Sequence, residues 1–224
     1  TQRTDAADRS EGPARVVGRL TWLPPALADP ARQRLVHVGL AGQWIFGSSA
    51  SVRHKATPES FLAPPLVDTG TIAASHAVVP ALELAVQDGP WLVQSEYLAS
   101  IVAPDDGGTA SFWGGYVQAS VLLTGETRPY DRRRRAFGMV EPAVPFAPRA
   151  RRWRGAVELG ARYSYLDLDD GGVAGGRDHA FSVGLNWYWN RHVRLMADYG
   201  LTVVRGERPD GTLQVFQTRL QLVY

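Results

Sequence analysis

The chain has 224 residues, no cysteine and a formal net charge of +2, and of its 24 Lys and Arg residues only Lys55 is a lysine. The lack of cysteine excludes disulfide frameworks, thiol catalysis and cysteine-based zinc sites. No stretch approaches the roughly 20 consecutive apolar residues of a membrane-spanning helix, which excludes a helical membrane protein, and residues 1–15 lack the apolar core of a signal peptide.

Apolar and polar residues alternate with a period of two along most of the chain, which predicts β-strands with one apolar and one polar face. About ten strands of this kind suit an all-β, antiparallel transmembrane β-barrel. Residues 1–14 are expected to form an N-terminal polar segment or loop and residues 15–224 the barrel. The predicted strands, in chain order, are residues 16–22, 35–46, 52–60, 77–87, 91–102, 112–126, 157–165, 181–190, 193–202 and 213–224.

The predicted connections differ in length. Residues 87–90 and 190–191 are short, whereas residues 104–109, 167–178 and 205–211 are longer and rich in Gly and Asp. This asymmetry is typical of the short periplasmic turns and longer outer loops of membrane barrels.

A soluble β-sandwich would also show alternating strands, so the placement of aromatic and charged residues must separate the two folds. Trp91, Trp113, Trp187, Trp189 and Tyr224 fall near the ends of predicted strands, where a barrel carries its aromatic girdles. Charged residues recur on the opposite parity near strand centres, where a water-filled lumen tolerates them. Both features favour the barrel.

Several motifs, preserved in order from about residue 15 to the end, resemble the phosphate-selective porin O and P family of bacterial outer-membrane channels. The motifs are Pro58-Glu59-Ser60, Val67-Asp68-Thr69-Gly70, Gln94-Ser95-Glu96-Tyr97, Gly115-Tyr116-Val117-Gln118-Ala119-Ser120, Leu123-Thr124-Gly125-Glu126, Ala161-Arg162-Tyr163-Ser164 and Gly184-Leu185-Asn186-Trp187-Tyr188. The resemblance implies a 16-stranded barrel, usually a homotrimer, with arginines and lysines in the pore that guide phosphate or related anions. Ten strands suit the C-terminal portion of such a barrel, so about six strands and a signal peptide are expected before Thr1.

The polar parity of the predicted strands supplies candidate pore-lining residues. They are Arg19, Arg53, Glu83, Glu96, Glu126, Arg128, Arg162, Arg194, Asp198 and Arg219. Rings of Arg or Lys favour anions, whereas rings of Asp or Glu favour cations. Because both signs are present, two interpretations stay open: a path for anions such as phosphate or polyphosphate, and ion pairs that stiffen the wall of the lumen.

The strongest cluster of charge is the predicted connection at residues 127–154. Its basic residues include Arg132, Arg133, Arg134, Arg135, Arg151, Arg152 and Arg154. This segment is interpreted as an electrostatic funnel at one mouth, a contact with acidic lipid head groups, a solvated loop, or a docking surface for a protein partner in an envelope complex. It lacks interleaved aromatic residues, so nucleic-acid binding is not expected. Its side of the membrane depends on whether residues 135–140 hide a further strand.

Features of an enzyme or a metal site are weak. The five histidines are scattered without metal-ligand spacing, and no Gly-rich phosphate loop opens a helix. Asp167, Asp169 and Asp170 lie near paired glycines, where weak calcium binding is a less favoured alternative to a flexible outer loop. We therefore expect no enzyme, no cofactor and no metal. The expected partners are outer-membrane lipid and small anions, and the alternative function is a structural or anchoring barrel component of a larger assembly.

Overall fold

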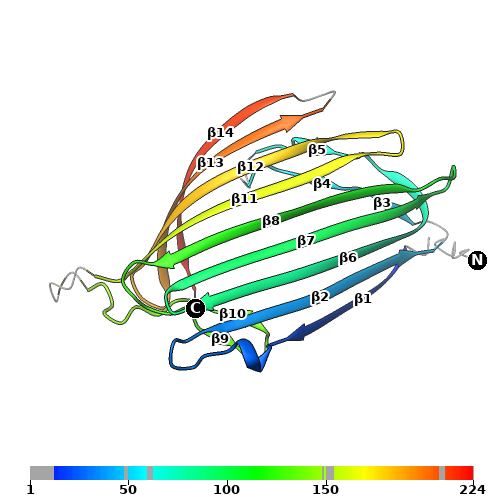
Figure 1. Cartoon of the computed structure of the whole chain (residues 1–224). Helices are drawn as coiled ribbons and strands as arrows, with labels where there is room; N and C mark the ends of the chain where they lie inside the picture. The colour runs from blue at the N-terminus through cyan, green and yellow to red at the C-terminus, as the bar shows by residue number, and fades with distance from the viewer. Residues whose placement is uncertain are drawn as a thin grey trace, which may run out of the picture.

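The computed structural model describes residues 13–47, 50–59, 63–147, 149, 154–206 and 210–223. In this part of the chain a 10-stranded antiparallel sheet dominates the fold (Figure 1). The long strands of the sheet follow one another in chain order. They are β1 (Ala14–Trp22), β2 (Leu35–Phe46), β6 (Ile72–Asp88), β7 (Trp91–Pro104), β8 (Ala110–Leu122), β11 (Ala156–Asp170), β12 (Val173–Tyr188), β13 (Val193–Arg205) and β14 (Gly211–Leu222).

Short elements lie in the connections. They are η1 (Pro25–Leu27), β3 (Ser51–Val52), β4 (Lys55–Ala56), β5 (Val67–Asp68), β9 (Tyr130–Asp131) and β10 (Ala136–Phe137). Among the described residues, no helix has the length and apolar character needed to cross a membrane.

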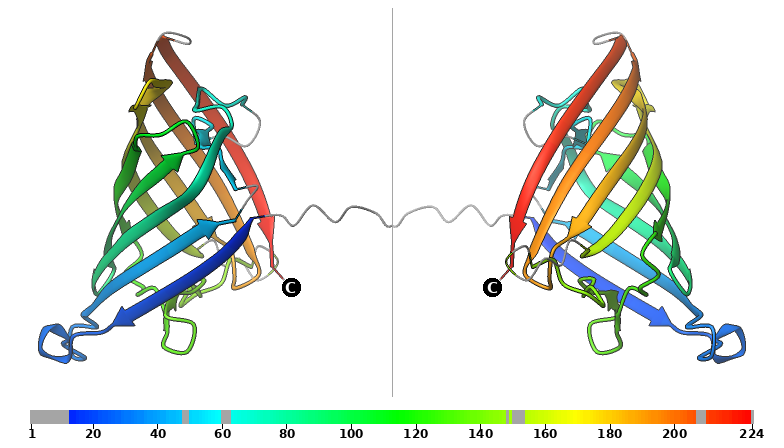
Figure 2. Two further views of the ribbon diagram at one scale, coloured as in Figure 1. Left: turned by 90° about the vertical axis from the view of Figure 1, so that its right-hand side faces the viewer. Right: turned by 90° about the vertical axis from the view of Figure 1, so that its left-hand side faces the viewer.

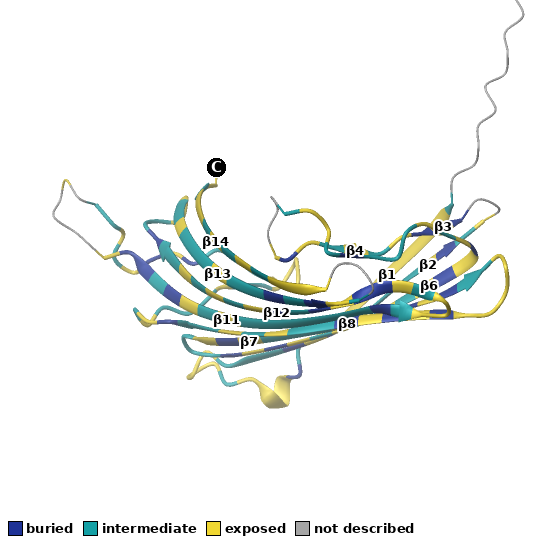
Figure 3. Cartoon of the chain, turned by 90° about the horizontal axis from the view of Figure 1, so that it is seen from above, coloured by how far each residue is buried: buried dark blue, intermediate teal, exposed yellow. Residues whose placement is uncertain are grey.

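The sheet is curved, and each long strand pairs with the next long strand along the chain. The two end-on views in Figure 2 show tilted strands around a trough, with β1 and β14 at its two edges. Seen from above, the strands follow one curve, and the β3–β5 segment lies on its concave side (Figure 3). An up-and-down meander of tilted antiparallel strands is the architecture of membrane barrels.

The convex face of the sheet is apolar and exposed. Leu20 is 74% exposed and Phe216 is 71% exposed, although both side chains are large and apolar. The pairing register places Leu20, Leu40 and Leu82 in one row across three strands. A soluble sandwich would bury such a face against a second sheet, and the other sheets of the described residues are only two-stranded. An apolar surface of this extent fits contact with lipid.

The first long connection joins β2 to β6 and folds onto the concave face. Val52 and Val67 belong to a buried cluster that also holds Val102, Phe112 and Leu168 from the sheet. The expectation of a membrane strand at residues 52–60 is therefore wrong. Because β2 pairs directly with β6, the sheet leaves no hydrogen-bonding edge for a further full-length strand between them.

The second long connection, residues 123–155, joins β8 to β11 and also reaches the concave face. Val140 is buried with Leu122, Ala156 and Tyr188. The strands β8 and β11 are direct antiparallel neighbours, so residues 135–140 contain no spanning strand, and β9 and β10 form a small hairpin instead. This connection lies at the end of the sheet where β14 finishes (Figure 1).

Two other sequence-based boundaries need correction. Most of residues 167–178, expected as a long loop, belong to β11 and β12, and the strands turn at Gly171 and Gly172 with φ values of 59° and 83°. Glycine adopts these positive φ values without steric cost. The strand expected at residues 112–126 ends at Leu122.

Candidate pore-lining site

A cavity of about 570 Å³ lies against the polar concave face of the sheet. Successive side chains of a strand point to opposite faces, so the parity that sends apolar residues outward sends charged residues into this cavity. Its charged lining residues carry both signs. They are Arg19, Glu83, Glu96, Arg128, Arg135, Glu158, Arg162, Arg194 and Asp198.

Arg19 on β1 is held by Glu83 on β6. Its Nε and Nη2 atoms lie 2.7 and 2.5 Å from the two carboxylate oxygens of Glu83, a bidentate ion pair. His37 adds a contact of 3.3 Å to the same carboxylate, and its other ring nitrogen lies 2.7 Å from the Tyr130 hydroxyl. Gly39 on β2 leaves room for the Glu83 side chain, since a Cβ atom at position 39 would lie 2.9 Å from Glu83 Oε2.

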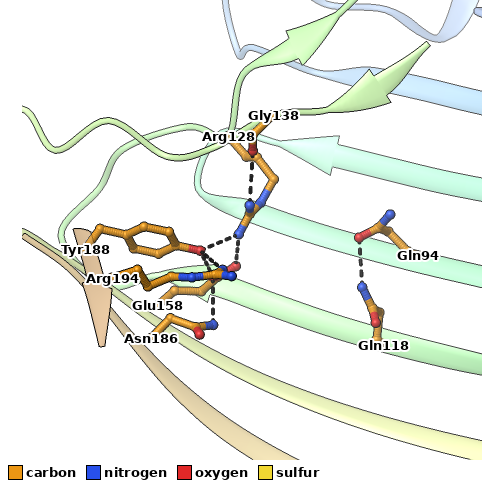
Figure 4. A network of polar contacts seen from close by, with 8 residues as sticks. All are labelled: Gln94, Gln118, Arg128, Gly138, Glu158, Asn186, Tyr188 and Arg194. Carbon is orange, nitrogen blue, oxygen red and sulfur yellow. Dashed lines mark hydrogen bonds and ion pairs between the residues drawn. The ribbon is translucent and has the colours of Figure 1, made fainter. Parts of the chain in front are cut away.

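Arg128 anchors the second long connection to the wall through Glu158 on β11 and Tyr188 on β12 (Figure 4). Its Nη2 atom donates to Glu158 Oε1 at 2.6 Å and to the Tyr188 hydroxyl at 3.0 Å. The Tyr188 hydroxyl donates to Glu158 Oε2 at 2.7 Å, and Asn186 donates to the same oxygen at 3.1 Å. The Glu158 side chain is only 4% exposed, so its charge depends on these partners.

Arg162 on β11 is positioned by two neighbours on β8. Its guanidinium carbon lies 3.6 Å from the centre of the Tyr116 ring, and its Nη1 atom donates to Gln118 Oε1 at 3.0 Å. Gln118 in turn donates to Gln94 Oε1 at 2.8 Å, as Figure 4 shows. The remaining Nε edge donates to the Glu59 carboxylate at 2.9 Å. These contacts fix the orientation of the Arg162 guanidinium group, which is always charged.

Two of the predicted pore-lining arginines have no carboxylate at ion-pair distance within the described residues. Arg194 donates to Gln221 Oε1 at 2.6 Å and to the Tyr188 hydroxyl at 3.2 Å. Arg219 has Met196 Sδ as its polar neighbour, 3.3 Å from Nη2. A second cavity of about 380 Å³ beside Arg219 is also lined by Asp198 and Glu59.

Two other sequence-based candidates lie away from the main cavity. Arg53 lies in the β2–β6 connection and forms a bidentate pair with Asp68, at 2.9 and 2.5 Å. This pair, with a hydrogen bond from the Gly70 amide, lowers the pKa of Asp68 to about 2. Glu126 lies beyond the end of β8, where it accepts hydrogen bonds from Thr124 and from the Ala143 amide at 3.1 Å.

The basic segment places its arginines at one end of the sheet. Arg132, Arg133 and Arg134 are exposed in the β9–β10 hairpin, whereas Arg135 lines the main cavity. The Arg134 and Arg133 amides donate to Asp131 and lower the pKa of its carboxyl.

The rest of the segment contributes less to the site. The Arg154 carbonyl accepts a hydrogen bond of 2.8 Å from Trp187 Nε1. Arg151 and Arg152 lie outside the described residues.

Sequence reasoning missed several lining residues. Glu158 lies on the same parity as Arg162, so the period of two was a sufficient signal for it. Glu59 and Tyr130 reach the site from connections, so the alternation along the sheet strands does not mark them as lining residues. No group of three or more potential metal ligands occurs among the residues that the structure describes.

A curved, tilted antiparallel sheet with an apolar convex face and a charged, hollowed concave face has the architecture of the wall of a membrane β-barrel. Residues 16–224 match the family model described as phosphate-selective porin O and P, and the chain belongs to that family. It is 30% identical to an uncharacterized protein of Caulobacter vibrioides over 181 residues, covering 79% of this chain and 36% of that protein. It is 30% identical to Porin O of Pseudomonas aeruginosa over 157 residues, covering 64% of this chain and 34% of that porin. The chain thus spans about a third of the length of these curated relatives.

Proposed function

We propose that the protein is a bacterial outer-membrane porin, whose concave face lines a path for passive diffusion of small hydrophilic solutes, with small anions favoured. The observation that carries this proposal is the charged cavity of about 570 Å³ on the face opposite the exposed apolar surface. A polar lumen inside a lipid-facing apolar band is what a diffusion channel requires. The name of the matching family makes phosphate or polyphosphate the first anions to test.

The pairing of charges supports a modest anion preference. Arg19, Arg128 and Arg162 each share their charge with a carboxylate, so they add little net positive potential to the lumen. Arg194, Arg219 and the exposed hairpin arginines 132–134 lack such partners in the residue set described, apart from the exposed pair of Arg134 with Asp131 at 3.8 Å. The acids Glu96 and Asp198 also line the cavity without an ion pair among the described residues. The preference would therefore come from a small excess of unpaired guanidinium groups rather than from a continuous positive lining.

We further propose that the β8–β11 connection faces the periplasm and the β2–β6 connection the outer side. The last strand of a barrel of this class ends at the periplasmic side, and β14 ends beside the β8–β11 connection. The hairpin arginines would then form a positive patch at the inner mouth. Assembly as a homotrimer, with outer-membrane lipid around it, is part of the same proposal.

Ion conductance of the purified protein in planar lipid bilayers tests this function. We expect stepwise conductance, a reversal potential that shows modest preference for chloride over potassium, and reduced chloride current when phosphate is added. An absence of conductance, or a preference for cations, would contradict the proposal.

A second candidate is a structural or anchoring component of an envelope assembly. The observation that favours it is the buried Arg128–Glu158 pair, which holds a long connection against the concave face, where residues of that connection line the main cavity. Copurification separates the two candidates. A homotrimer with stepwise conductance supports the porin, whereas a stoichiometric protein partner that survives detergent, without conductance, supports the anchor.

A further inference from the structure

The carboxylate of Glu59 accepts hydrogen bonds from a set of donors on β11 and β12. Its Oε1 atom accepts from Arg162 Nε and from the Ser164 hydroxyl, both at 2.9 Å. Its Oε2 atom accepts from the Ser182 hydroxyl at 2.8 Å. Both oxygens of one planar carboxylate are therefore satisfied by a cation and two hydroxyl groups.

These donors belong to the sheet, and their positions do not depend on Glu59. Arg162 on β11 and Ser182 on β12 are direct partners in the strand register. The Arg162 guanidinium is already fixed by the Tyr116 ring and by Gln118. The wall therefore carries a preorganised oxyanion site, and preorganisation reduces the ordering that a ligand must impose.

Glu59 reaches this site from a connection, not from the sheet. It lies in the β2–β6 connection with a φ of 48°, an uncommon conformation for a residue other than glycine. Its backbone carbonyl accepts a hydrogen bond of 3.3 Å from Gln217 on β14. A residue other than glycine keeps a positive φ only where surrounding contacts stabilise that conformation. Glu59 is therefore a carboxylate ligand of the site on β11 and β12 that is attached to the same chain through the β2–β6 connection.

The site is open to a solute. The side chains of Glu59 and Arg162 are 29% and 33% exposed, and the cavity of about 380 Å³ adjoins Glu59 and Ser182. Arg162 is the one cation among the donors. Glu96 binds the hydroxyl of the stacked Tyr116 at 2.6 Å, and the neighbouring cavity is lined by Asp198 and Arg219 together. A donor set with a single cation in direct contact suits a monoanion better than a dianion.

We propose that Arg162, Ser164 and Ser182 form a binding site for the carboxylate group of small monocarboxylate solutes, and that Glu59 is its built-in competitor. When Glu59 leaves, the carboxylate of a permeating solute takes the same three hydrogen bonds. A tethered ligand acts at an effective concentration of about millimolar or higher, so it weakens the apparent affinity for a free solute. This inference rests on the proposed function as a channel and adds a substrate class to it.

The test compares wild type with Glu59→Ala in planar lipid bilayers, using acetate and propionate as probes of chloride current. We expect half-block of the current at about tenfold lower acetate concentration in Glu59→Ala, because the tethered competitor is gone. Glu59→Ala combined with Arg162→Ala should lose this sensitivity. Asp106→Ala is the control, since it removes an exposed carboxylate in the connection between β7 and β8 that belongs to neither the site nor its supports.

Equal sensitivity of wild type and Glu59→Ala would overturn the proposal. A tenfold gain in Asp106→Ala as well would overturn it too, because the effect would then be one of general charge. Block of Glu59→Ala by inorganic phosphate at lower concentration than by acetate would overturn the assignment to monocarboxylates.

Equilibrium binding of radiolabelled propionate to the detergent-solubilised protein tests the carboxylate site separately from the proposed channel function. Saturable binding by Glu59→Ala that requires Arg162 supports the site even in a protein that does not conduct. A protein that conducts but does not bind propionate would support the proposed channel function and contradict the carboxylate site.

Discussion

Arg128 in the β8–β11 connection donates to a buried carboxylate of the sheet, with its Nη2 atom 2.6 Å from Glu158 Oε1. Their side chains are 16% and 4% exposed, so each charge has the other as its main compensation. A long connection is thus fixed against the concave face by an ion pair that water barely reaches. The position of the β8–β11 connection therefore depends on Glu158 in β11.

Replacement of Glu158 by Gln should destabilise the protein strongly, because it leaves the Arg128 charge buried without a partner. Breaking one side of a buried pair costs about 3–5 kcal/mol. Urea unfolding in detergent micelles measures the free energy of unfolding. The double variant with Arg128→Met should recover part of the loss, and a Glu158→Gln variant as stable as wild type would show that the pair is solvated.

Replacement of Glu83 by Gln should raise the preference for anions, because it removes the carboxylate that shares the charge of Arg19. We expect the chloride-to-potassium permeability ratio, obtained from reversal potentials, to increase by about threefold, the effect of about 0.6 kcal/mol at this ion pair. Asp106→Asn is the control, since Asp106 is exposed in the connection between β7 and β8. An equal change in both variants would contradict a local effect at Arg19.

Replacement of Arg132, Arg133 and Arg134 by Gln should reduce chloride conductance at low salt and leave it nearly unchanged at high salt. The three side chains are exposed at one mouth, where their field acts over the Debye length. That length is about 10 Å at 0.1 M and about 3 Å at 1 M ionic strength. Single-channel conductance at both concentrations measures the effect. A reduction that is the same at both would exclude electrostatic concentration of anions as its cause.

The Arg53–Asp68 pair should hold the β2–β6 connection down to acidic pH. The pKa of Asp68 lies at about 2 in the fold and near 3.8 ordinarily. Since folding lowers this pKa, its contribution to stability is complete above about pH 4 and is lost as the pH falls through 2.

Hydrogen exchange of the Gly70 amide, which donates to Asp68 at 2.9 Å, reports the state of this anchor. Arg53→Ala should move the loss of protection upward, toward pH 4, because the hydrogen bond from Arg53 is the largest cause of the lowered pKa. Unchanged protection between pH 4 and pH 2 in that variant would show that Arg53 does not control the titration of Asp68.

The sequence by itself determined the strand alternation and hence the two faces of the sheet. Leu20 and Phe216 could be assigned outward and Arg19 and Arg162 inward because side-chain direction along a strand is a local property of the backbone. The family motifs extended this to the porin class, and the match over residues 16–224 confirms it. Which solute passes, and in what oligomer, stays a proposal.

Only the tertiary structure decided which charges are free. Arg162 and Glu59 are 103 residues apart, and Arg128 and Glu158 are 30 apart, so no local pattern joins either pair. The alternation at residues 52–60 predicted a strand of the sheet. Because β2 pairs directly with β6, these residues belong instead to a connection that packs on the concave face. Strand pairing and ion pairing are contacts between distant segments, and their energies depend on burial and register, which the fold alone sets.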